Sequence, residues 1–293
     1  MKMEINMKRF FTVVLIALLS CSIACAQGSG SMRPGHGANR GNGVHRVHGN
    51  NRVSNGKSKY TPEILRFVVE GVSFDMVEVR GGTFRMGATP EQGGDAESDE
   101  KPVHSVTLSS YYIGKTEVTQ ELWQAVMGST PSDSIGDNMP IVGVSWYDCQ
   151  EFIRELNALT GRNFRLPTEA EWEFACRGGN NSRGYKYSGS NYINDVAWYE
   201  DNSGEVEHPV GTKAPNELGI YDMSGNVDEW CSDWWGGYTS GAQYNPKGPY
   251  DGECRVTRGG CFAGSACICR SSTRMCLYEP KYGDGILGLR LAL

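Results

Sequence analysis

A short acidic stretch at residues 222–230 constrains this chain more than any other part of its sequence. It reads Asp-Met-Ser-Gly-Asn-Val-Asp-Glu-Trp, so two carboxylates, Asp222 and Glu229, lie on either side of Gly225. Glycine adopts backbone angles that are closed to other residues, and a tight turn here would direct carboxylates and backbone carbonyls to one point. Ca²⁺ binds converging oxygen atoms of this kind. The spacing is not that of an EF-hand loop, and an acidic surface turn backed by core tryptophans is the alternative.

Residues 1–26 have the layout of a secretory signal. Three basic residues precede an apolar run at 10–19, and small residues follow it. Ala-Cys-Ala at 24–26 fits cleavage before Gln27, whereas Leu-Leu-Ser-Cys ending at Cys21 is alternatively a lipoprotein box with a lipid anchor on that cysteine. The apolar run is too short for a membrane-spanning helix. We therefore expect an exported protein, periplasmic, cell-surface or secreted, in a compartment where disulfides form.

The next segment, residues 27–60, is a low-complexity arm rich in Gly, Asn, Ser and His. It carries basic residues and no acidic residue, and it lacks the apolar side chains that a folded core requires. We expect a flexible spacer that leads into one folded domain at residues 61–293. The chain has a net charge of −6 in spite of this basic arm, so the domain itself is acidic and nucleic acid is not an expected partner.

Apolar periodicity and turn residues give a coarse secondary structure for the domain. Strands are predicted over 72–79 and 83–86 as partners, over 103–108, and over 255–260 and 288–293 at the end of the chain. The last two enclose a loop-rich insert, and residues 180–254 are expected to be mostly turns with embedded tryptophan and tyrosine.

Three helices are predicted by N-cap residues and closing glycines over 119–128, 145–161 and 168–178. In the last of them, Thr168 and Glu171 form a capping box, in which each side chain bonds to the backbone of the other.

Cysteine and histidine usage limits the chemistry. Eight cysteines follow the signal, and in an exported chain they indicate bridges or buried thiols rather than a zinc site. Only His104 and His208 occur beyond residue 60, which argues against a Ser-His-Asp hydrolase.

Six short motifs together resemble the formylglycine-generating enzyme (sulfatase-modifying factor) family. They occur in the family's order and cover roughly residues 72–293; the matching stretches are 82–87, 115–119, 165–173, 223–230, 258–260 and 288–290. The resemblance implies an α+β, C-type-lectin-like domain with little regular secondary structure.

The resemblance also implies two calcium sites. In the first, the family positions correspond to Asp222, Gly225, Val227 and Glu229, which favours Ca²⁺ over a plain acidic turn at this stretch. The second maps less directly, because the loop differs in length; its positions are Asp195, Val196, Asn202 and Gly204.

The catalytic motif of the family is incomplete. Its oxidases hold Cu(I) with two cysteines, spaced Cys-x-x-x-x-Cys after a Gly-Gly-Ser lead, and soft thiolates suit that ion. Here the lead serine is Cys261, the first copper position is Gly264, and only the second is retained, as Cys269. Further departures are Ser265 and Asp228, in place of a histidine and a tryptophan. Cys269 and Cys261 are the candidate catalytic residues if the chain is an oxidase, and copper is expected only in that case.

A disulfide could make the remaining copper-binding thiol, that of Cys269, unavailable. A bridge from Cys176 to Cys269 or Cys276 near the presumed cleft would make Cys269, in the first case, unavailable to copper. The sequence alone does not assign the bridges.

The insert at 261–287 lies where the family forms its substrate surface. We expect it to be exposed and to bind an unknown protein or peptide ligand, with these candidate residues: Phe262, Ile268, Arg270, Arg274 and Tyr278. Its layout is similar to the variable proteins of diversity-generating retroelements; an ordinary divergent loop is the alternative. The sequence thus favours a non-catalytic binding or accessory protein, such as a subunit of an export or gliding machine, over a formylglycine-generating oxidase. A membrane contact is expected only through a lipid anchor at Cys21.

Overall fold

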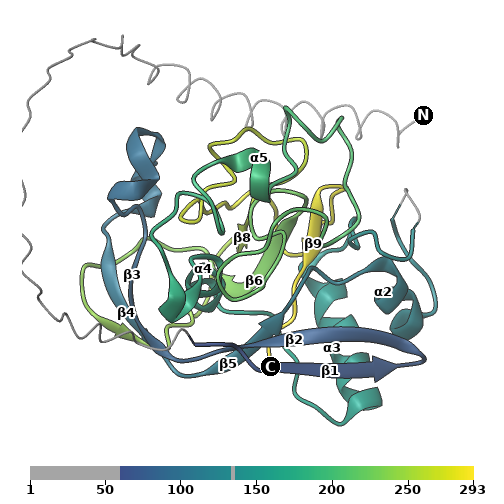
Figure 1. Ribbon diagram of the computed structural model, residues 1–293. Helices are drawn as coiled ribbons and strands as arrows, with labels where there is room; N and C mark the ends of the chain where they lie inside the picture. Colours follow the sequence, from purple (N-terminus) through teal and green to yellow (C-terminus); the bar gives the residue numbers. More distant parts are fainter. Residues whose placement is uncertain (1–59, 133–135) are drawn as a thin grey trace, which may run out of the picture.

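The computed structural model describes residues 60–132 and 136–293 (Figure 1). The predicted signal at 1–26, the lipid anchor at Cys21 and the spacer up to residue 59 lie outside the described residues. In the part that is described, no helix is long and apolar enough to cross a membrane.

The first sheet has the order β1-β2-β5 and is antiparallel. Its strands are β1 (Ile64–Val69), β2 (Val72–Val79) and β5 (Tyr111–Gly114). The prediction of a strand over 72–79 is confirmed, but the strand at 83–86 is not its partner. Glu70 and Gly71 both have positive φ, which is the backbone of a two-residue hairpin turn, so β2 pairs with the strand that precedes it.

A second sheet has the order β3-β4-β7. It contains β3 (Gly82–Met86), β4 (His104–Leu108) and the short β7 (Gln243–Tyr244). The acidic loop between β3 and β4 forms two 3₁₀ turns, η1 (Pro90–Asp95) and η2 (Ser98–Glu100).

The third sheet has the order β8-β6-β9 and holds the acidic stretch. Its strands are β6 (Asp228–Trp234), β8 (Arg255–Arg258) and β9 (Leu287–Leu289). The two predicted strands at the end of the chain are confirmed, although β9 is shorter than expected. The central strand β6 was not predicted, because three acids and a serine among its seven residues give it no alternating apolar pattern. It is nevertheless almost wholly buried, because it pairs with β8 on one edge and β9 on the other.

The three predicted helices are confirmed with their caps. They are α2 (Gln120–Met127), α3 (Trp146–Thr160) and α4 (Glu169–Cys176), with a short α5 (Ile193–Val196) and a 3₁₀ turn η3 (Gly179–Asn181). The Thr168 hydroxyl accepts from the Glu171 amide at 3.2 Å, while the Glu171 carboxylate accepts from the Thr168 amide at 2.9 Å. The orphan donors at the start of α4 are thereby satisfied.

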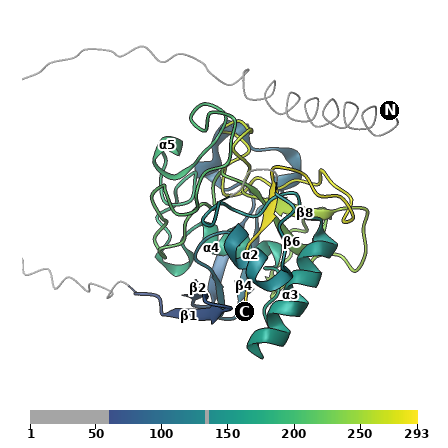
Figure 2. The same ribbon diagram turned by 90° about the vertical axis from the view of Figure 1, so that its right-hand side faces the viewer.

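The elements pack in an irregular α+β arrangement. Figures 1 and 2 show α2 and α3 together on one side, the β1-β2-β5 sheet along one edge, and α4 beside β6 in the centre. Trp123 of α2 stacks on Phe152 of α3, with ring centroids 4.8 Å apart. The backbone of Leu293 pairs with that of Tyr112 in β5, which fixes the C-terminal residue against the first sheet.

Buried arginines join the C-terminal third of the chain to the rest. Four of them are at most 4% exposed, and each pairs with a glutamate; they are Arg258, Arg270, Arg274 and Arg290. Arg258 Nη2 lies 2.6 Å from Glu173 Oε2 and 3.0 Å from Glu169 Oε1, inside the domain. Burial alone would raise the pKa of Glu169, but Arg274 and Arg258 hold it below its usual value. Most of these ion pairs connect distant parts of the domain, which its short sheets do not join.

We predict that Arg258→Met destabilises the domain by about 3–5 kcal/mol, because removing one partner of a buried ion pair is strongly destabilising. Glu169 and Glu173 would each keep only one arginine, Arg274 and Arg177. Urea unfolding followed by circular dichroism measures the change. Arg154→Met is the matched control: this arginine is exposed and pairs with two surface glutamates, so it should change stability little. Equal stability of the two variants would contradict the prediction.

Candidate functional site

The acidic stretch forms a tight turn that leads directly into β6. Asp222, Gly225 and Asn226 have φ of 57°, 76° and 64°, which is the left-handed region. A Cβ on Gly225 would lie 2.2 Å from the carbonyl oxygen of Trp198. Glycine is therefore required at this position both for its backbone angle and for the close approach of a neighbouring chain segment.

Glu229 is directed toward an arginine. Arg290 Nε lies 2.9 Å from Glu229 Oε2, Arg290 Nη2 lies 2.7 Å from Oε1, and Trp172 Nε1 donates to Oε2 at 2.7 Å. Both side chains of the ion pair are fully buried. The carboxylate is thus already satisfied by donors from α4 and from the residue after β9.

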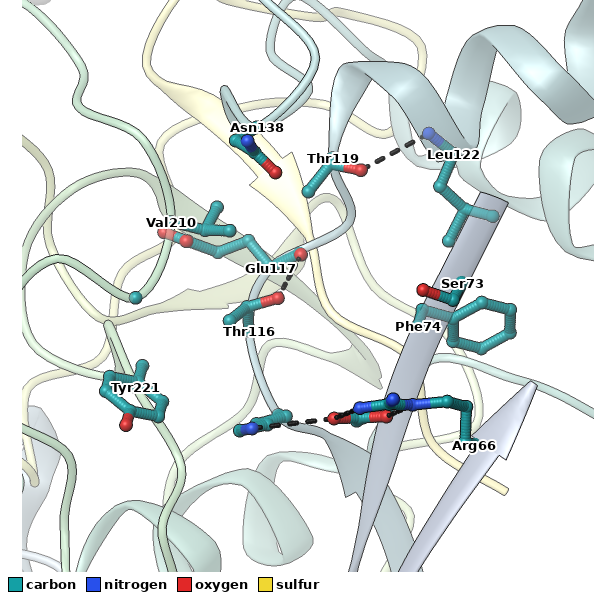
Figure 3. A pocket seen from close by; sticks show the side chains of 13 residues that line it. Arg66, Ser73, Phe74, Thr116, Glu117, Thr119, Leu122, Asn138, Val210 and Tyr221 are labelled. Atoms are coloured by element: carbon teal, nitrogen blue, oxygen red, sulfur yellow. Dashed lines mark hydrogen bonds and ion pairs between the residues drawn. The ribbon is translucent and has the colours of Figure 1, made fainter. Parts of the chain in front are cut away.

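Asp222 lies instead beside a second acid, Glu117. Asp222 Oδ2 accepts from the Gly211 amide at 2.6 Å, and the Glu117 carboxylate accepts from Asn226 Nδ2 at 3.1–3.2 Å. Burial raises the pKa of Asp222 to about 6. Burial, followed by the charge of Asp222, raises the pKa of Glu117 well above its usual range. Glu117 also lines a cavity of about 330 Å³ between β2, α2 and the loop that holds Val210 (Figure 3).

These contacts bear on whether the turn fits Ca²⁺. Three buried acids, Glu117, Asp222 and Glu229, lie near one guanidinium, that of Arg290, so full ionisation of all three would leave an excess of negative charge. That excess fits a cation near Asp222 and Glu117. Glu229 would join the ligands only by leaving Arg290. Among the described residues, no group of three or more His, Cys, Asp or Glu side chains is already arranged to hold a metal ion.

The residues of the second predicted calcium site lie in and after α5. Asn202 Oδ1 accepts from the Tyr199 amide at 2.9 Å, and its Nδ2 donates to the Ala197 carbonyl at 3.0 Å. Asp195 Oδ2 accepts from the Ser190 hydroxyl at 3.0 Å. The two polar side chains therefore close the loop on itself; Val196 is buried and Gly204 is an exposed residue with positive φ.

The position of the first copper ligand is closed. A Cβ on Gly264 would lie 2.1 Å from Ile268 Cδ1 and 2.9 Å from Cγ1, and Ile268 is itself 2% exposed. Burial raises the pKa of both Cys269 and Cys261 well above the usual range of a thiol. The family's first copper cysteine is replaced by Gly264, so the residues present do not supply the family's pair of copper-binding cysteines.

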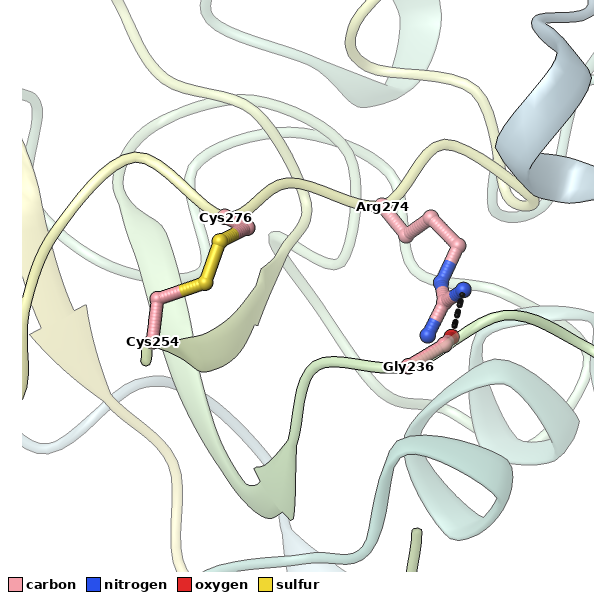
Figure 4. Close-up of a disulfide and its surroundings, with 4 residues drawn as sticks. All are labelled: Gly236, Cys254, Arg274 and Cys276. Atoms are coloured by element: carbon pink, nitrogen blue, oxygen red, sulfur yellow. Dashed lines mark hydrogen bonds between the residues drawn. A yellow bond between two sulfur atoms is a disulfide. The ribbon is translucent and has the colours of Figure 1, made fainter. Parts of the chain in front are cut away.

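A single disulfide is seen among the described cysteines, and it joins Cys254 to Cys276 (Figure 4). The alternative bridges from Cys176 are therefore wrong: Cys176 and Cys269 are both buried and unbridged. The observed bridge links β8 to the later part of the insert. Cys176 instead lies on α4, where its thiol meets the Met223 carbonyl.

The expectation that the insert displays an exposed binding surface is wrong for four of its five candidates. Ile268, Arg270, Arg274 and Tyr278 are at most 4% exposed, whereas Phe262 is partly buried. The reason is electrostatic as well as apolar, since both arginines turn inward to acids from distant parts of the chain.

The two arginine contacts are specific. Arg270 Nη2 lies 2.5 Å from Glu100 of η2. Arg274 forms a bidentate pair with Glu169, with both distances 2.7 Å, and its guanidinium also donates to the Gly236 carbonyl (Figure 4). The insert is thus part of the domain's interior framework.

Two residues of the site were absent from the predicted set. Glu117 belongs to the motif at 115–119, and Arg290 belongs to the motif at 288–290, so both were within matched stretches. A search for the counter-charge of each buried acid in the motifs would have found Arg290, whereas the closeness of Glu117 to Asp222 depends on the fold.

Comparisons with known proteins identify the family of this chain. The family profile described as "Sulfatase-modifying factor enzyme 1-like domain" matches residues 70–293. The chain belongs to this family, and its α+β fold is that of its structural neighbours. The C-type-lectin likeness stays an expectation.

Similar proteins carry different names. The chain is 36% identical to the "Chaperone protein LppX" of Paenibacillus barcinonensis, over 74% of this chain and 87% of that protein. It is 30% identical to a formylglycine-generating enzyme of Thermomonospora curvata, over 78% and 97% of the two chains. Among solved structures, Treponema denticola variable protein 1 has a TM-score of 0.72 and 33% identity, covering 79% of this chain and 99% of the other.

We predict that restoring the family's cysteine by Gly264→Cys does not create a copper site. The new side chain would displace Ile268 within the core, which should lower the free energy of unfolding by about 1–3 kcal/mol. The double variant Gly264→Cys, Ile268→Ala supplies space and serves as the comparison. Thermal melting and titration with Cu(I) measure the two effects; tight Cu(I) binding by the single variant at unchanged stability would contradict this prediction.

Proposed function

We propose that this chain is a non-catalytic member of its family that acts as a binding or accessory protein. The observation that carries the proposal is the loss of one copper-binding cysteine: Gly264 stands at its position, and the Ile268 side chain packs into the space beside this glycine. The scaffold is retained, whereas the two-thiolate chemistry of the oxidases has no geometry here.

The relatives support this proposal in part. A protein named as a chaperone and a protein named as variable are both about as similar to this chain as the formylglycine-generating enzymes. The family scaffold therefore appears under names that denote no oxidation reaction. The second candidate function, a copper-dependent formylglycine-generating oxidase acting on sulfatase cysteines, is favoured by those enzymes' names and by the retained Cys269.

If the insert is diversified, the segment available for variable residues is shorter than the sequence suggested. Most of the insert is buried, and the large exposed side chains in it are confined to the segment that holds Glu279, Lys281 and Tyr282. If residues vary there to change binding, this segment is where they would do so with least effect on the core. The other proposed properties are export, by the signal at 1–26, and stabilisation by Ca²⁺ at the acidic turn.

A peptide assay tests the absence of oxidase activity. We expect no mass change when the mature chain is incubated with a Cys-x-Pro-x-Arg peptide, copper and oxygen, because Gly264 replaces one of the two cysteines of the family's linear two-sulfur copper site. Mass spectrometry of the peptide detects conversion to formylglycine. An authentic formylglycine-generating enzyme run in parallel is the positive control, and turnover by this chain would overturn the proposal.

Chelation tests the calcium proposal. An ion that binds only the folded state stabilises it by mass action, so EDTA should lower the melting temperature by several degrees, and added Ca²⁺ should restore it. Asp222→Asn should reduce this shift, because it removes a charged ligand. Identical melting in Ca²⁺ and in EDTA would refute calcium at this turn.

A further inference from the structure

One partly buried arginine breaks the pairing pattern of the domain. The other buried or partly buried arginines each lie within 4 Å of a glutamate, as Arg165 and Arg177 do with Glu171 and Glu173. Arg255, at the start of β8, has no carboxylate within that distance among the described residues. A cation withdrawn from water without a counter-charge is costly, so this exception indicates a site at which the counter-charge comes from elsewhere.

The surroundings of Arg255 hold its guanidinium in place. The guanidinium carbon lies 4.0 Å from the ring centroid of Trp146 and 3.6 Å from that of Trp234. Nη1 donates to the Ser232 carbonyl at 2.6 Å, whereas Nε is buried without a partner. Burial lowers the pKa of Arg255, because removal from water disfavours the charged form of a side chain.

The nearest acids do not supply the missing charge. Asp233 Oδ2 accepts from the Glu169 amide and from the Ser232 hydroxyl, and burial together with the charge of Glu169 raises the pKa of Asp233 to about 7. Glu171 is held by Arg165 in a bidentate pair at 2.6 and 2.7 Å. Neither carboxylate is therefore free to turn to Arg255.

Arg255 also lines the largest of the cavities described, with a volume of about 590 Å³. The volume is in the range of ligand sites in proteins. Its charged side chains are Arg165, Lys247 and Arg255 against Glu171, so the side chains that line this cavity carry a net positive charge although the chain as a whole has a net charge of −6. Lys247 is exposed and forms no ion pair with the described residues.

The remaining lining favours a peptide. Apolar side chains (Leu166 and Trp146) and residues with amides and hydroxyls, among them Gln150 and Ser110, line it together. Such a mixture matches the apolar side chains and the backbone amides of an extended segment. Tyr147, which is 56% exposed and packs edge-on against Trp146, extends the aromatic surface outward.

We propose that this cavity binds an acidic peptide segment of a partner protein, with an aspartate or glutamate carboxylate on Arg255 and Lys247 and the flanking residues against Trp146 and Leu166. This inference deepens the proposed function, because it rests on the chain being a binding protein. It places the binding surface in the cleft between α3, the start of α4 and β8, on residues separate from the buried insert.

A peptide selection tests this proposal. Octapeptides with a central glutamate and randomised flanks, acetylated and amidated at their ends, are selected on the immobilised mature chain. The best peptide is then compared with its central Glu→Gln twin by titration. We expect the glutamate peptide to bind at least about tenfold more tightly, as for a charge-assisted hydrogen bond, with an affinity that falls as salt is added.

Three variants locate the binding. Arg255→Gln should reduce affinity at least about tenfold. Because Arg255 also packs on two tryptophans, Lys247→Gln is the second variant: its side chain is exposed, so it should weaken binding while the melting temperature stays unchanged. Arg154→Gln is the matched control, because this exposed arginine of α3 does not line the cavity, and the variant should bind as the wild-type chain does.

Several outcomes would overturn the proposal. These are a selection without enrichment of acidic peptides, equal affinity for the two twins, full affinity in a folded Arg255→Gln or Lys247→Gln variant, and complete competition by millimolar free acetate or glutamate, which would indicate a small-acid site. Each outcome leaves the oxidase question untouched. Conversely, turnover in the formylglycine assay would refute the proposed function without altering a peptide affinity that depends on Arg255.

Discussion

The buried ion pair between Glu229 and Arg290 is the contact on which the arrangement of this domain depends. It joins the central strand β6 to the residue that follows β9, and Arg290 also donates to the carbonyls of Gly114 and Tyr221. One guanidinium therefore connects the third sheet, the end of β5 and the acidic turn. A lysine would not reproduce these directions, because its ammonium lacks the planar fork of donors.

Buried arginine–glutamate pairs also explain why the insert between β8 and β9 stabilises the fold rather than presenting an exposed binding surface. Arg270 and Arg274 lie among loop residues, yet each is anchored to a glutamate more than 100 positions earlier in the chain. Loops held in this way have little freedom to change sequence. The closed space beside Gly264 is part of the same packing, so the loss of the copper position and the rigidity of the insert have a common physical basis.

Much of the fold could be predicted from local signals, because caps and turn residues act over a few positions. Thr119, Ser145 and Thr168 each begin a helix where their side chains can accept from the helix backbone. Strand β6 could not be predicted in this way. Its acids are buried because distant groups satisfy them: Arg290 pairs with Glu229, the Gly260 amide donates to Asp228, and the Glu169 amide donates to Asp233. No window of sequence contains these partners together.

The candidate site, like the fold, could be predicted only in part from the sequence. The motifs identified Asp222 and Glu229 as important acids, but they did not show that Glu229 faces Arg290 or that Glu117 lies beside Asp222. Nor could the sequence place Arg270 and Arg274 inside the domain, since arginine in a loop ordinarily indicates exposure. Which side chain faces which charge is a property of the assembled fold.

The order of charges along the chain has a consequence for how the domain is made. Glu100, Glu169, Glu173 and Glu229 all precede the arginines that pair with them, at 258, 270, 274 and 290. A nascent chain that ends before residue 258 therefore holds three acids, Glu100, Glu169 and Glu229, whose arginine partners have yet to be synthesised, whereas Glu173 already has Arg177. Burying the three unpaired acids at that stage is unfavourable. Such a polypeptide stays open and hydrated until its last segment emerges, and only then can the whole domain condense in one step.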